Sequence, residues 1–406
     1  MAPEGDNMMG VKRNNRSAAL RVLHQKGSMS RKRLAEQLRL TPAAITKIVG
    51  EMLGEGLLAE GETVSSGSAG RREIMLDINS RSAAALGVLI NLRQAIVSAV
   101  WLDGTVIFSE ECSLPPRAPV DETVRMLSAR LLELADAHGL RREQLIGLGI
   151  AVRGITAPDG RSVVNSFGAL GGENLPLCRR FEALTGLPAV MSNNVRALLA
   201  SQIFLSRDEN VDSQFFLRCE YGIGAALSVG GRIWHGHTQQ CAEIGHIPVI
   251  RRGGKLCSCG KSGCLETIAS PAAIREDALA ALGEETTPVL WRQSLKKGAQ
   301  ALDVDDVLNA AMAGDAGAAQ IIDQAVLALG GALKSVIYLI DPGKIIFYGR
   351  MFDHPYFLSR LLAELKEGMD GGHSPVIEKS RYNRALEDRA ASLLAVVDFF
   401  NRGGLR

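Results

Sequence analysis

Four residues that can bind a metal ion occur close together in the second half of the chain. His246 is followed by Cys257, Cys259 and Cys264, so that one imidazole and three thiols fall within 19 residues. Glycines between the cysteines allow the tight turns that closely spaced sulfurs need in order to converge. Four nitrogen and sulfur ligands with no vacant position describe a closed, structural zinc site. Free buried cysteines and a catalytic zinc with an open position are the two alternatives.

The other cysteines indicate a reducing compartment. The chain has seven cysteines, an odd number, and three are crowded into the segment just described. This favours a metal cluster over a disulfide framework. The remaining four are isolated and are expected to be small core residues: Cys112, Cys178, Cys219 and Cys241.

No part of the sequence suggests export or membrane insertion. Residues 1–10 contain no apolar segment of the kind found in a secretion signal. No stretch approaches the roughly 18 uninterrupted apolar residues that a membrane span needs. We therefore expect a cytoplasmic protein without a membrane partner.

Positive charge is concentrated near the beginning of the chain. Residues 11–72 contain 12 Lys and Arg against 5 Asp and Glu, whereas the whole chain carries a net charge of +2. A basic segment in front of a mildly acidic remainder indicates that a polyanion binds the basic segment. A surface that is merely well solvated is the alternative.

Length and composition indicate a soluble α/β protein of more than one domain. The chain has 406 residues, of which 46% are hydrophobic and 22% charged, and it contains 43 glycines. We expect a flexible arm over residues 1–14, a small domain over 15–78 and a larger α/β domain over 79–406.

The basic segment has the pattern of a helix-turn-helix. Apolar residues recur at three- and four-residue spacing over residues 16–58, which predicts three short amphipathic helices. Ser30 and Thr41 are expected N-caps of the second and third helices, and Pro42 suits a first helical position. Arg39 occupies the turn position where glycine is usual, so a left-handed backbone there would cost about 1 kcal/mol.

A wing is expected to follow the third helix. Extended runs over residues 57–64 and 74–78 flank a Ser/Gly loop at 65–70, with Arg71 and Arg72 directly after it. Two strands around a basic loop complete a winged helix-turn-helix, the class of domain that binds an operator in double-stranded DNA.

The third helix would enter the major groove, because its outward side chains are short or polar and let the backbone approach base edges. Basic residues on the neighbouring helices would meet phosphates, and those on the wing suit a minor groove or its flanking backbone. A three-helix bundle that docks a protein is the alternative. The expected DNA contacts are Arg13, Arg16, Arg31, Lys32, Arg33, Thr41, Pro42, Ala43, Thr46, Lys47, Arg71 and Arg72.

Strand-like and helical segments alternate after Ala83, which indicates helices packed on a mixed sheet. The predicted strands are residues 84–90, 95–101, 145–152, 189–191, 215–218 and 345–347. The predicted helices are residues 121–138, 195–205, 271–282, 304–312 and 316–340.

One segment resembles the signature of a known family. Glu243-Ile-Gly-His246, followed by Cys257-x-Cys-Gly-x-x-Gly-Cys264-Leu-Glu266, is similar to the motif of the ROK family of repressors and sugar kinases. The resemblance covers about residues 13–400 and includes the winged helix-turn-helix of the family's repressor branch. It implies an actin-like pair of α/β lobes around a cleft, over residues 79–200 plus the C-terminal helix and 201–380, assembled as a homodimer or homotetramer.

The resemblance fails where a kinase would bind ATP and activate a sugar. Residues 89–93, Leu-Ile-Asn-Leu-Arg, stand where kinase members have Asp-x-Gly-Gly-Thr, and Tyr221 replaces an expected Thr. The family's catalytic base is the Asp of Glu-Asn-Asp, whereas this chain has Ser-Asn-Asn ending at Asn194. An amide cannot take a proton as a general base. We therefore expect no kinase activity.

The sugar-binding side of the family's pocket is retained in part. The resemblance implies hydroxyl-binding roles for Asn193, Asn194, Glu243, His246 and Glu266, since carboxylates and amides are suited to hydroxyl groups. The alternative is that these residues only brace the zinc loop. Another sugar-contacting asparagine of the family has no clean equivalent here, so the identity of the ligand stays open.

These expectations combine into a hypothesis about function. The chain would be a repressor of carbohydrate-utilisation genes that responds to a sugar or sugar derivative in a catalytically dead kinase cleft. Two protomers would place their third helices in successive major grooves of a pseudo-palindromic operator. The alternatives are a regulator switched by a partner protein and an active ATP-dependent sugar kinase with a DNA-binding head.

Overall fold

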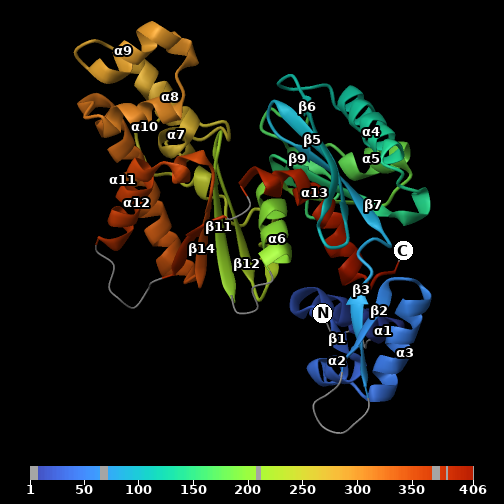
Figure 1. Ribbon diagram of the computed structural model, residues 1–406. Coiled ribbons are helices and arrows are strands. Elements are labelled where there is room, and N and C mark those ends of the chain that lie inside the picture. Colours follow the sequence, from blue (N-terminus) through green and yellow to red (C-terminus); the bar gives the residue numbers. More distant parts are fainter. Residues whose placement is uncertain (1–7, 65–71, 207–211, 368–374, 381–382, 406) are drawn as a thin grey trace. The chain divides into compact units, whose positions relative to one another are not determined.

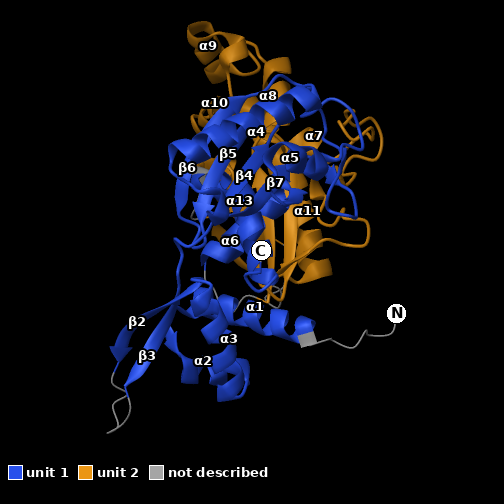
Figure 2. Cartoon of the chain, turned by 90° about the vertical axis from the view of Figure 1, so that its right-hand side faces the viewer, with its two compact units in different colours: residues 1–210, 384–406 blue, residues 211–383 orange. Residues whose placement is uncertain are grey.

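The chain divides into two compact units, one of which is built from two separate stretches of the sequence. The computed structural model describes residues 8–64, 72–206, 212–367, 375–380 and 383–405 (Figure 1). Unit 1 comprises Met1–Asn210 and Arg384–Arg406, and unit 2 comprises Val211–Asn383 (Figure 2). The chain therefore leaves unit 1 once and returns to it once.

Unit 1 begins with a head, which is defined here as residues 8–78 without 65–71. Its helices are α1 (Met8–Lys26), α2 (Arg31–Leu38) and α3 (Pro42–Gly54). Its small sheet has the order β1-β3-β2, in which β1 (Met29–Ser30) and β2 (Leu58–Val64) are both antiparallel to β3 (Glu73–Ile78). Leu20, Leu34, Ile45 and Leu76 are fully buried and join the helices to the sheet in one core.

The expected ends of the head's helices are confirmed. Ser30 Oγ accepts a hydrogen bond from Arg33 N at 3.4 Å, and Thr41 Oγ1 accepts one from Ala44 N at 3.3 Å. Each hydroxyl satisfies a backbone donor that the first turn leaves free. Arg39 ends α2 with φ 52° and ψ 40°, the left-handed conformation expected for that turn.

The expectation of a flexible arm over residues 1–14 is wrong for residues 8–14, which form the first turns of α1. Methionine, lysine and arginine favour helix, so α1 extends beyond its buried segment. Lys12 Nζ also lies 2.8 Å from Glu51 Oε2, an ion pair that ties the start of α1 to α3. Residues 1–7 lie outside the described part of the chain.

The large sheet of unit 1 is mixed, as expected. Its order is β10 (Ala189–Asn193), β7 (Leu145–Val152), β4 (Ala84–Ile90), β5 (Gln94–Trp101) and β6 (Val106–Ser113). The first three strands are parallel to one another, and β5 is antiparallel to both of its neighbours. A short ladder of β8 (Ile155–Thr156) and β9 (Val163–Asn165) lies outside this sheet.

Helices cover both faces of this sheet. Leu86 and Val88 point to the face that packs on α4 (Val120–Ala137) and α5 (Leu177–Thr185). The opposite face packs on α13 (Asn383–Asn401), shown in red in Figure 1. Glycines permit this second contact, because a Cβ on Gly149 would lie 1.8 Å from Ala391 O of α13.

Unit 2 contains a second mixed sheet with helices on one face. The strand order is β13 (Arg232–Trp234), β12 (Ile223–Val229), β11 (Ser213–Cys219), β14 (Lys344–Tyr348) and β15 (Val376–Lys379). The helices are α7 (Glu266–Ala269), α8 (Pro271–Ala280), α9 (Pro288–Lys297), α10 (Val304–Met312), α11 (Ala316–Ile340) and α12 (Pro355–Lys366). Leu217 and Phe347 of the sheet share one core with Leu329 and Leu333 of α11.

The two large sheets have the same strand order. In each, a three-stranded antiparallel meander is followed by two strands that add in parallel on the other side of the first strand. β11 corresponds to β4, and β14 and β15 correspond to β7 and β10. The expected α/β architecture with mixed sheets is therefore confirmed, and it occurs twice.

One helix in the described part of the chain, α11, is long and apolar enough to cross a membrane by length and composition. Ile322, Leu329 and Leu333 on this helix are fully buried in the core of unit 2. We therefore interpret α11 as a core helix, for which the same composition is usual.

Candidate functional site

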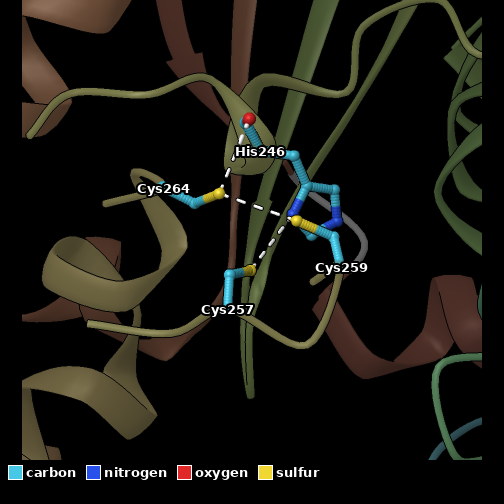
Figure 3. A group of neighbouring side chains, drawn as sticks. All are labelled: His246, Cys257, Cys259 and Cys264. Carbon is cyan, nitrogen blue, oxygen red and sulfur yellow. Dashed lines mark hydrogen bonds between the residues drawn. The ribbon is translucent and has the colours of Figure 1, made fainter. Parts of the chain in front are cut away.

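The structure brings the four predicted metal ligands together. The ligand atoms of His246, Cys257, Cys259 and Cys264 all lie within 4.8 Å of one another (Figure 3). His246 Nδ1 is 3.5 Å from Cys257 Sγ, and the sulfurs of Cys259 and Cys264 are 3.6 Å apart. One nitrogen and three sulfurs in such a group are a donor set that can hold a metal ion with tetrahedral preference.

Tight turns in the loop between His246 and α7 make this convergence possible. Cys257 N donates to Lys261 O at 2.7 Å, which closes the turn that carries Cys259. Gly263 has φ 75°, and a Cβ there would lie 2.0 Å from Ile250 O. The glycine immediately before Cys264 is therefore required by both backbone conformation and space.

The protein environment does not by itself favour thiolates at two of the three cysteines. Burial raises the pKa of the Cys257 thiol, and it raises the pKa of the Cys264 thiol to about 12. The pKa of Cys259 is lowered, because hydrogen bonds from the Lys261 backbone and the other thiols outweigh the effect of burial. A bound cation would have to displace protons from Cys257 and Cys264, as metal ions do at thiol sites.

Three of the expected hydroxyl-binding residues adjoin this metal cluster. Glu243 precedes the short 3-10 turn Ile244–His246, and Glu266 begins α7 two residues after Cys264. Glu266 Oε2 accepts a hydrogen bond from Ile223 N at 2.9 Å. These positions agree both with a ligand-binding role and with a role in bracing the metal loop.

The other two expected ligand residues belong to unit 1. Asn193 ends β10, and its Oδ1 accepts hydrogen bonds from Val195 N at 2.8 Å and Arg196 N at 3.4 Å, so it caps α6 (Asn194–Ser206). Its Nδ2 donates to Gly154 O at 2.7 Å. Asn194 is buried, with 4% exposure, and its Nδ2 donates to Asn91 Oδ1 at 3.1 Å.

The contact between Asn194 and Asn91 is one that the sequence reasoning missed. Asn91 stands at a glycine position of the kinase phosphate loop Asp-x-Gly-Gly-Thr. The structure shows that its amide oxygen accepts a hydrogen bond from Asn194, the residue that stands where the kinases have their catalytic aspartate. An amide at each of the two positions allows this pair, because amides can both donate and accept hydrogen bonds. The signal available in the sequence was that both kinase motifs carry an asparagine at a changed position.

The region that corresponds to a second phosphate loop is occupied by a carboxylate. A Cβ on Gly222 would lie 2.2 Å from Glu266 Oε2, and the next amide, Ile223 N, already donates to the same oxygen. A phosphate at this turn would lose that amide as a donor and face a negative charge. Gly222 is thus explained by close approach of Glu266.

Most of the predicted DNA contacts lie on the exposed surface of the head. On α3 and at its N-cap, Thr41, Pro42, Ala43, Thr46 and Lys47 are all exposed. Lys32 and Arg33 of α2 and Arg13 of α1 are exposed as well. Thr46 Oγ1 donates to Pro42 O at 2.8 Å, which leaves the hydroxyl oxygen free to accept from a further donor.

Arg16 is not on this surface, and the expectation that it contacts DNA is wrong. Its side chain is 0% exposed. Nε donates to Gly403 O at 2.7 Å, Nη1 donates to Glu55 Oε1 at 2.8 Å, and Nη2 pairs with Glu55 Oε2. The periodicity of α1 turns Arg16 inward, where the carboxylate of α3 and the backbone after α13 satisfy its charge and donors.

The remaining basic residues, Arg31 of α2 and the two arginines of the wing, differ in whether the structure gives them an anionic partner. Arg31 Nη2 is 2.7 Å from Glu60 Oε1 of β2, so this guanidinium already has an anionic partner. Arg72 is exposed, directly before β3. Arg71 and the loop at 65–70 lie outside the described residues.

Arg39 is a further candidate for a phosphate contact that the sequence reasoning did not include. It is exposed and lines a hollow of about 470 Å³ between α2 and α3, together with Arg31, Lys32 and Thr46. The signal available in the sequence for this role was a basic side chain in the turn between α2 and α3.

Comparison with known proteins places the chain in a family. The sequence matches the ROK family over residues 94–391. The chain belongs to the ROK family. The match begins after the head, so the α/β part of unit 1 and unit 2 are the family's domain.

Relatives include regulators of similar length. The chain is 29% identical over 361 residues to the DNA-binding transcriptional dual regulator NagC of Escherichia coli strain K12, covering 86% of this chain and 85% of that protein. It is 27% identical over 336 residues to the transcriptional repressor Mlc of the same strain, covering 83% and 80%. The xylose repressor of Bacillus subtilis strain 168 is 23% identical over 361 residues, with 87% of each chain covered.

Solved structures confirm the fold. A ROK family transcriptional regulator described as a homologue of the E. coli Mlc protein has a TM-score of 0.79 and 24% identity, and covers 97% of both chains. A ROK glucokinase from Streptomyces griseus, solved with glucose and AMPPNP, has a TM-score of 0.65 and 21% identity, covering 77% of this chain and 99% of the kinase. The fold is that of the ROK sugar kinases. The similarity to the solved regulator covers more of this chain than the similarity to the glucokinase does.

Proposed function

We propose that the chain is a DNA-binding transcriptional regulator that represses carbohydrate-utilisation genes and responds to a sugar or sugar derivative. The observation that carries this proposal is the pairing of a basic, exposed helix-turn surface with a kinase fold in which Asn194 stands where the kinases have their catalytic aspartate and is hydrogen-bonded to Asn91. The regulators NagC, Mlc and the xylose repressor are related to it over more than four-fifths of its length.

The head would bind DNA as a winged helix-turn-helix. The N-cap Thr41 and the exposed Ala43, Thr46 and Lys47 present short or polar groups on α3, which suits a helix that lies in a major groove. Lys32, Arg33 and Arg13 would contact phosphates beside that groove. Arg72 and Arg71 on the wing would contact the neighbouring backbone or minor groove.

Each unit carries groups that suit a sugar effector. Asn193 and Asn194 from unit 1 and Glu243, His246 and Glu266 from unit 2 offer amide and carboxylate groups that suit vicinal hydroxyls. If His246 holds a metal ion, the nitrogen that would do so is Nδ1, which lies 3.5 Å from Cys257 Sγ. An effector shifts operator affinity only by its differential affinity for the two states of the protein.

Asn194 supports a sensor in preference to a kinase. An amide cannot remove the proton of a sugar hydroxyl, so the group at the start of α6 can hold a hydroxyl but cannot activate it. In this structure the Nδ2 of Asn194 donates a hydrogen bond to Asn91 Oδ1, and its Oδ1 accepts one from Val195 N at 3.0 Å. We propose that this site binds a sugar without catalysis.

The metal would be a structural zinc ion. The nitrogen and three sulfurs within 4.8 Å of one another match a closed four-ligand set. Zinc would cross-link the loop between the 3-10 turn Ile244–His246 and α7, so that Glu243 and Glu266 keep fixed positions. The partners we propose are double-stranded operator DNA and a second or further copies of the chain, in the cytoplasm, without a membrane partner.

The test is a DNA-binding titration at fixed salt. Purified protein is mixed with a DNA fragment that carries the promoter of its own gene, and N-acetylglucosamine, glucose, xylose and their phosphate esters are added in turn. Salt is held constant, because the phosphate contribution to affinity depends on it steeply. A severalfold shift by one sugar supports the proposal.

Other outcomes separate the alternatives. DNA binding that no sugar changes would favour a regulator switched by a partner protein. Turnover of ATP with any of these sugars, lost in Glu243→Gln, would show an active kinase. No binding to promoter DNA at low salt would refute the regulatory function.

A further inference from the structure

Two helices of the α/β part of unit 1 end against α1 of the head at the same place. The His24 ring of α1 stacks on the Phe204 ring of α6, with centroids 3.9 Å apart and an interplanar angle of 24°. His24 Nε2 lies 2.8 Å from Phe204 O. The Phe400 ring of α13 lies edge-on to both, at 5.9 Å from His24 and 5.8 Å from Phe204. We call His24, Phe204 and Phe400 the aromatic joint.

A second contact beside the joint leaves little freedom between α13 and the head. The buried Arg16 donates Nε to Gly403 O at 2.7 Å. A Cβ on Gly403 would lie 2.8 Å from Arg13 O, and one on Gly404 would lie 2.3 Å from Leu57 Cδ2. The backbone after α13 is thus in direct contact with α1 and with the residue before β2.

The far end of α6 is the candidate effector site. Asn193 caps α6 through Oδ1, and Asn194 is its first residue, so both groups proposed to hold a sugar from unit 1 are part of the helix start. The helix has 13 residues, which corresponds to about 19 Å at 1.5 Å per residue. Phe204 lies two residues before its end.

The same two helices lie next to the points where the chain crosses between the units. The chain passes into unit 2 after α6 and returns to unit 1 at the beginning of α13. Packed helices shift as small rigid bodies, because a close-packed core does not deform continuously.

We infer that the aromatic joint is the coupling element through which occupancy of the site at the start of α6 changes the affinity of the head for DNA. This inference rests on the proposed regulatory function and assigns positioning roles to His24 and Phe204. A ligand on Asn193 and Asn194 shifts α6, Phe204 moves with it, and the stacked His24 turns α1 and with it α3. Thermodynamic linkage requires that DNA bound to the head act back on the start of α6.

The test uses this reciprocal effect, so it needs no knowledge of the effector. Amide hydrogen exchange of the full chain is measured by mass spectrometry with and without the promoter DNA fragment described above. In the wild type, DNA is expected to change exchange across residues 194–206 by about twofold or more. Phe204→Leu and His24→Gln are expected to bind DNA within about threefold of wild type and to lose the change in α6.

Phe181→Leu is the matched control. Phe181 is also fully buried in unit 1, but it lies on α5 in the core on the other side of the sheet. This variant loses a ring without touching the joint, so it is expected to keep the DNA-induced change in α6. A purely structural role of the rings would affect all three variants alike.

Each outcome decides between the inference and the function on which it rests. The inference would be overturned if the wild type bound DNA with no change in the hydrogen exchange of residues 194–206, or if that change persisted in both joint variants. Neither result would contradict the proposed regulatory function. Loss of the change in Phe181→Leu as well would also overturn the inference. Failure of the wild type to bind DNA would refute the regulatory function itself.

Discussion

Arg16 provides a sharp test of how the structure divides the basic residues of the head. Arg16 and Arg13 lie three residues apart on α1, yet Arg16 is 0% exposed and Arg13 is exposed. We predict that Arg16→Met lowers stability without changing the salt dependence of DNA binding. Arg13→Met is predicted to do the reverse, which makes the pair a matched control.

The magnitude for Arg16→Met follows from its partners. Gly403 O is buried and loses its donor, which costs about 1–3 kcal/mol for a buried acceptor. The Glu55 side chain is 45% exposed and regains water, so the loss of its ion pair adds only about 1 kcal/mol. The sum is about 2–4 kcal/mol, and a unit of this size loses about 2–4 °C of unfolding midpoint per kcal/mol.

The assay combines thermal unfolding, followed by circular dichroism, with DNA affinity measured across a range of salt concentrations. For Arg16→Met, we expect a lower midpoint and an unchanged salt slope. For Arg13→Met, we expect an unchanged midpoint and a slope reduced by about 0.9, the value for one lost phosphate contact. A reduced slope together with full stability in Arg16→Met would refute the buried assignment.

Four further predictions concern the metal loop, the DNA surface and the packing of α13. Removal of metal by a chelator, or Cys259→Ser, should lower the unfolding midpoint and abolish the effector's influence on DNA affinity, since the loop loses its cross-link. Lys47→Ala should weaken DNA binding and reduce the salt slope by about 0.9 with no loss of stability, because Lys47 is exposed on α3. Arg39→Gly should raise stability by about 1 kcal/mol in denaturant unfolding, because the left-handed φ of 52° is relieved, and should also weaken DNA binding. Gly149→Ala should destabilise unit 1 by about 3 kcal/mol or prevent folding, because a Cβ would lie 1.8 Å from Ala391 O.

Specific results would contradict each of these expectations. A sugar response that persists after metal removal would show that the loop does not position the effector groups. An unchanged salt slope in Lys47→Ala would show that Lys47 of α3 does not contact DNA phosphates. The control variant is Glu62→Ala, which changes an exposed charged residue on β2. Full DNA affinity in Arg39→Gly would restrict Arg39 to a backbone role. Normal stability of Gly149→Ala would mean that α13 can move away from the sheet at little cost.

Local signals predicted much of the fold, because they depend on neighbouring residues in the chain. The strand at 145–152 and the helices at 304–312 and 316–340 have the predicted bounds, since an apolar run or a helical repeat with a clear cap marks each of them. Asp303 and Asp315 provide those two caps. The strands β6, β12 and β15 were missed, because polar edge strands and glycine-rich strands lack a clear alternation.

The candidate site was predictable to the extent that its residues adjoin in sequence. The cysteine spacing predicted the cluster of four ligands because turns bring such residues together locally. The partners of Arg16 were not predictable, since Gly403 is 387 residues away. Whether a basic residue on a helix faces solvent or pairs with groups inside the protein depends on such distant contacts, which the helical repeat alone does not reveal.

The return of the chain to unit 1 has a consequence for biosynthesis. The buried Arg16 finds its carbonyl acceptor at Gly403, and Gly87 and Gly149 receive α13, yet residues 384–405 leave the ribosome only after the whole of unit 2. Domains that are contiguous in sequence can fold as soon as they emerge. This head can dock on its supporting helix only after unit 2 has been translated, so a prematurely terminated product would present a head without its anchor and would not compete with the finished protein as a regulated DNA binder.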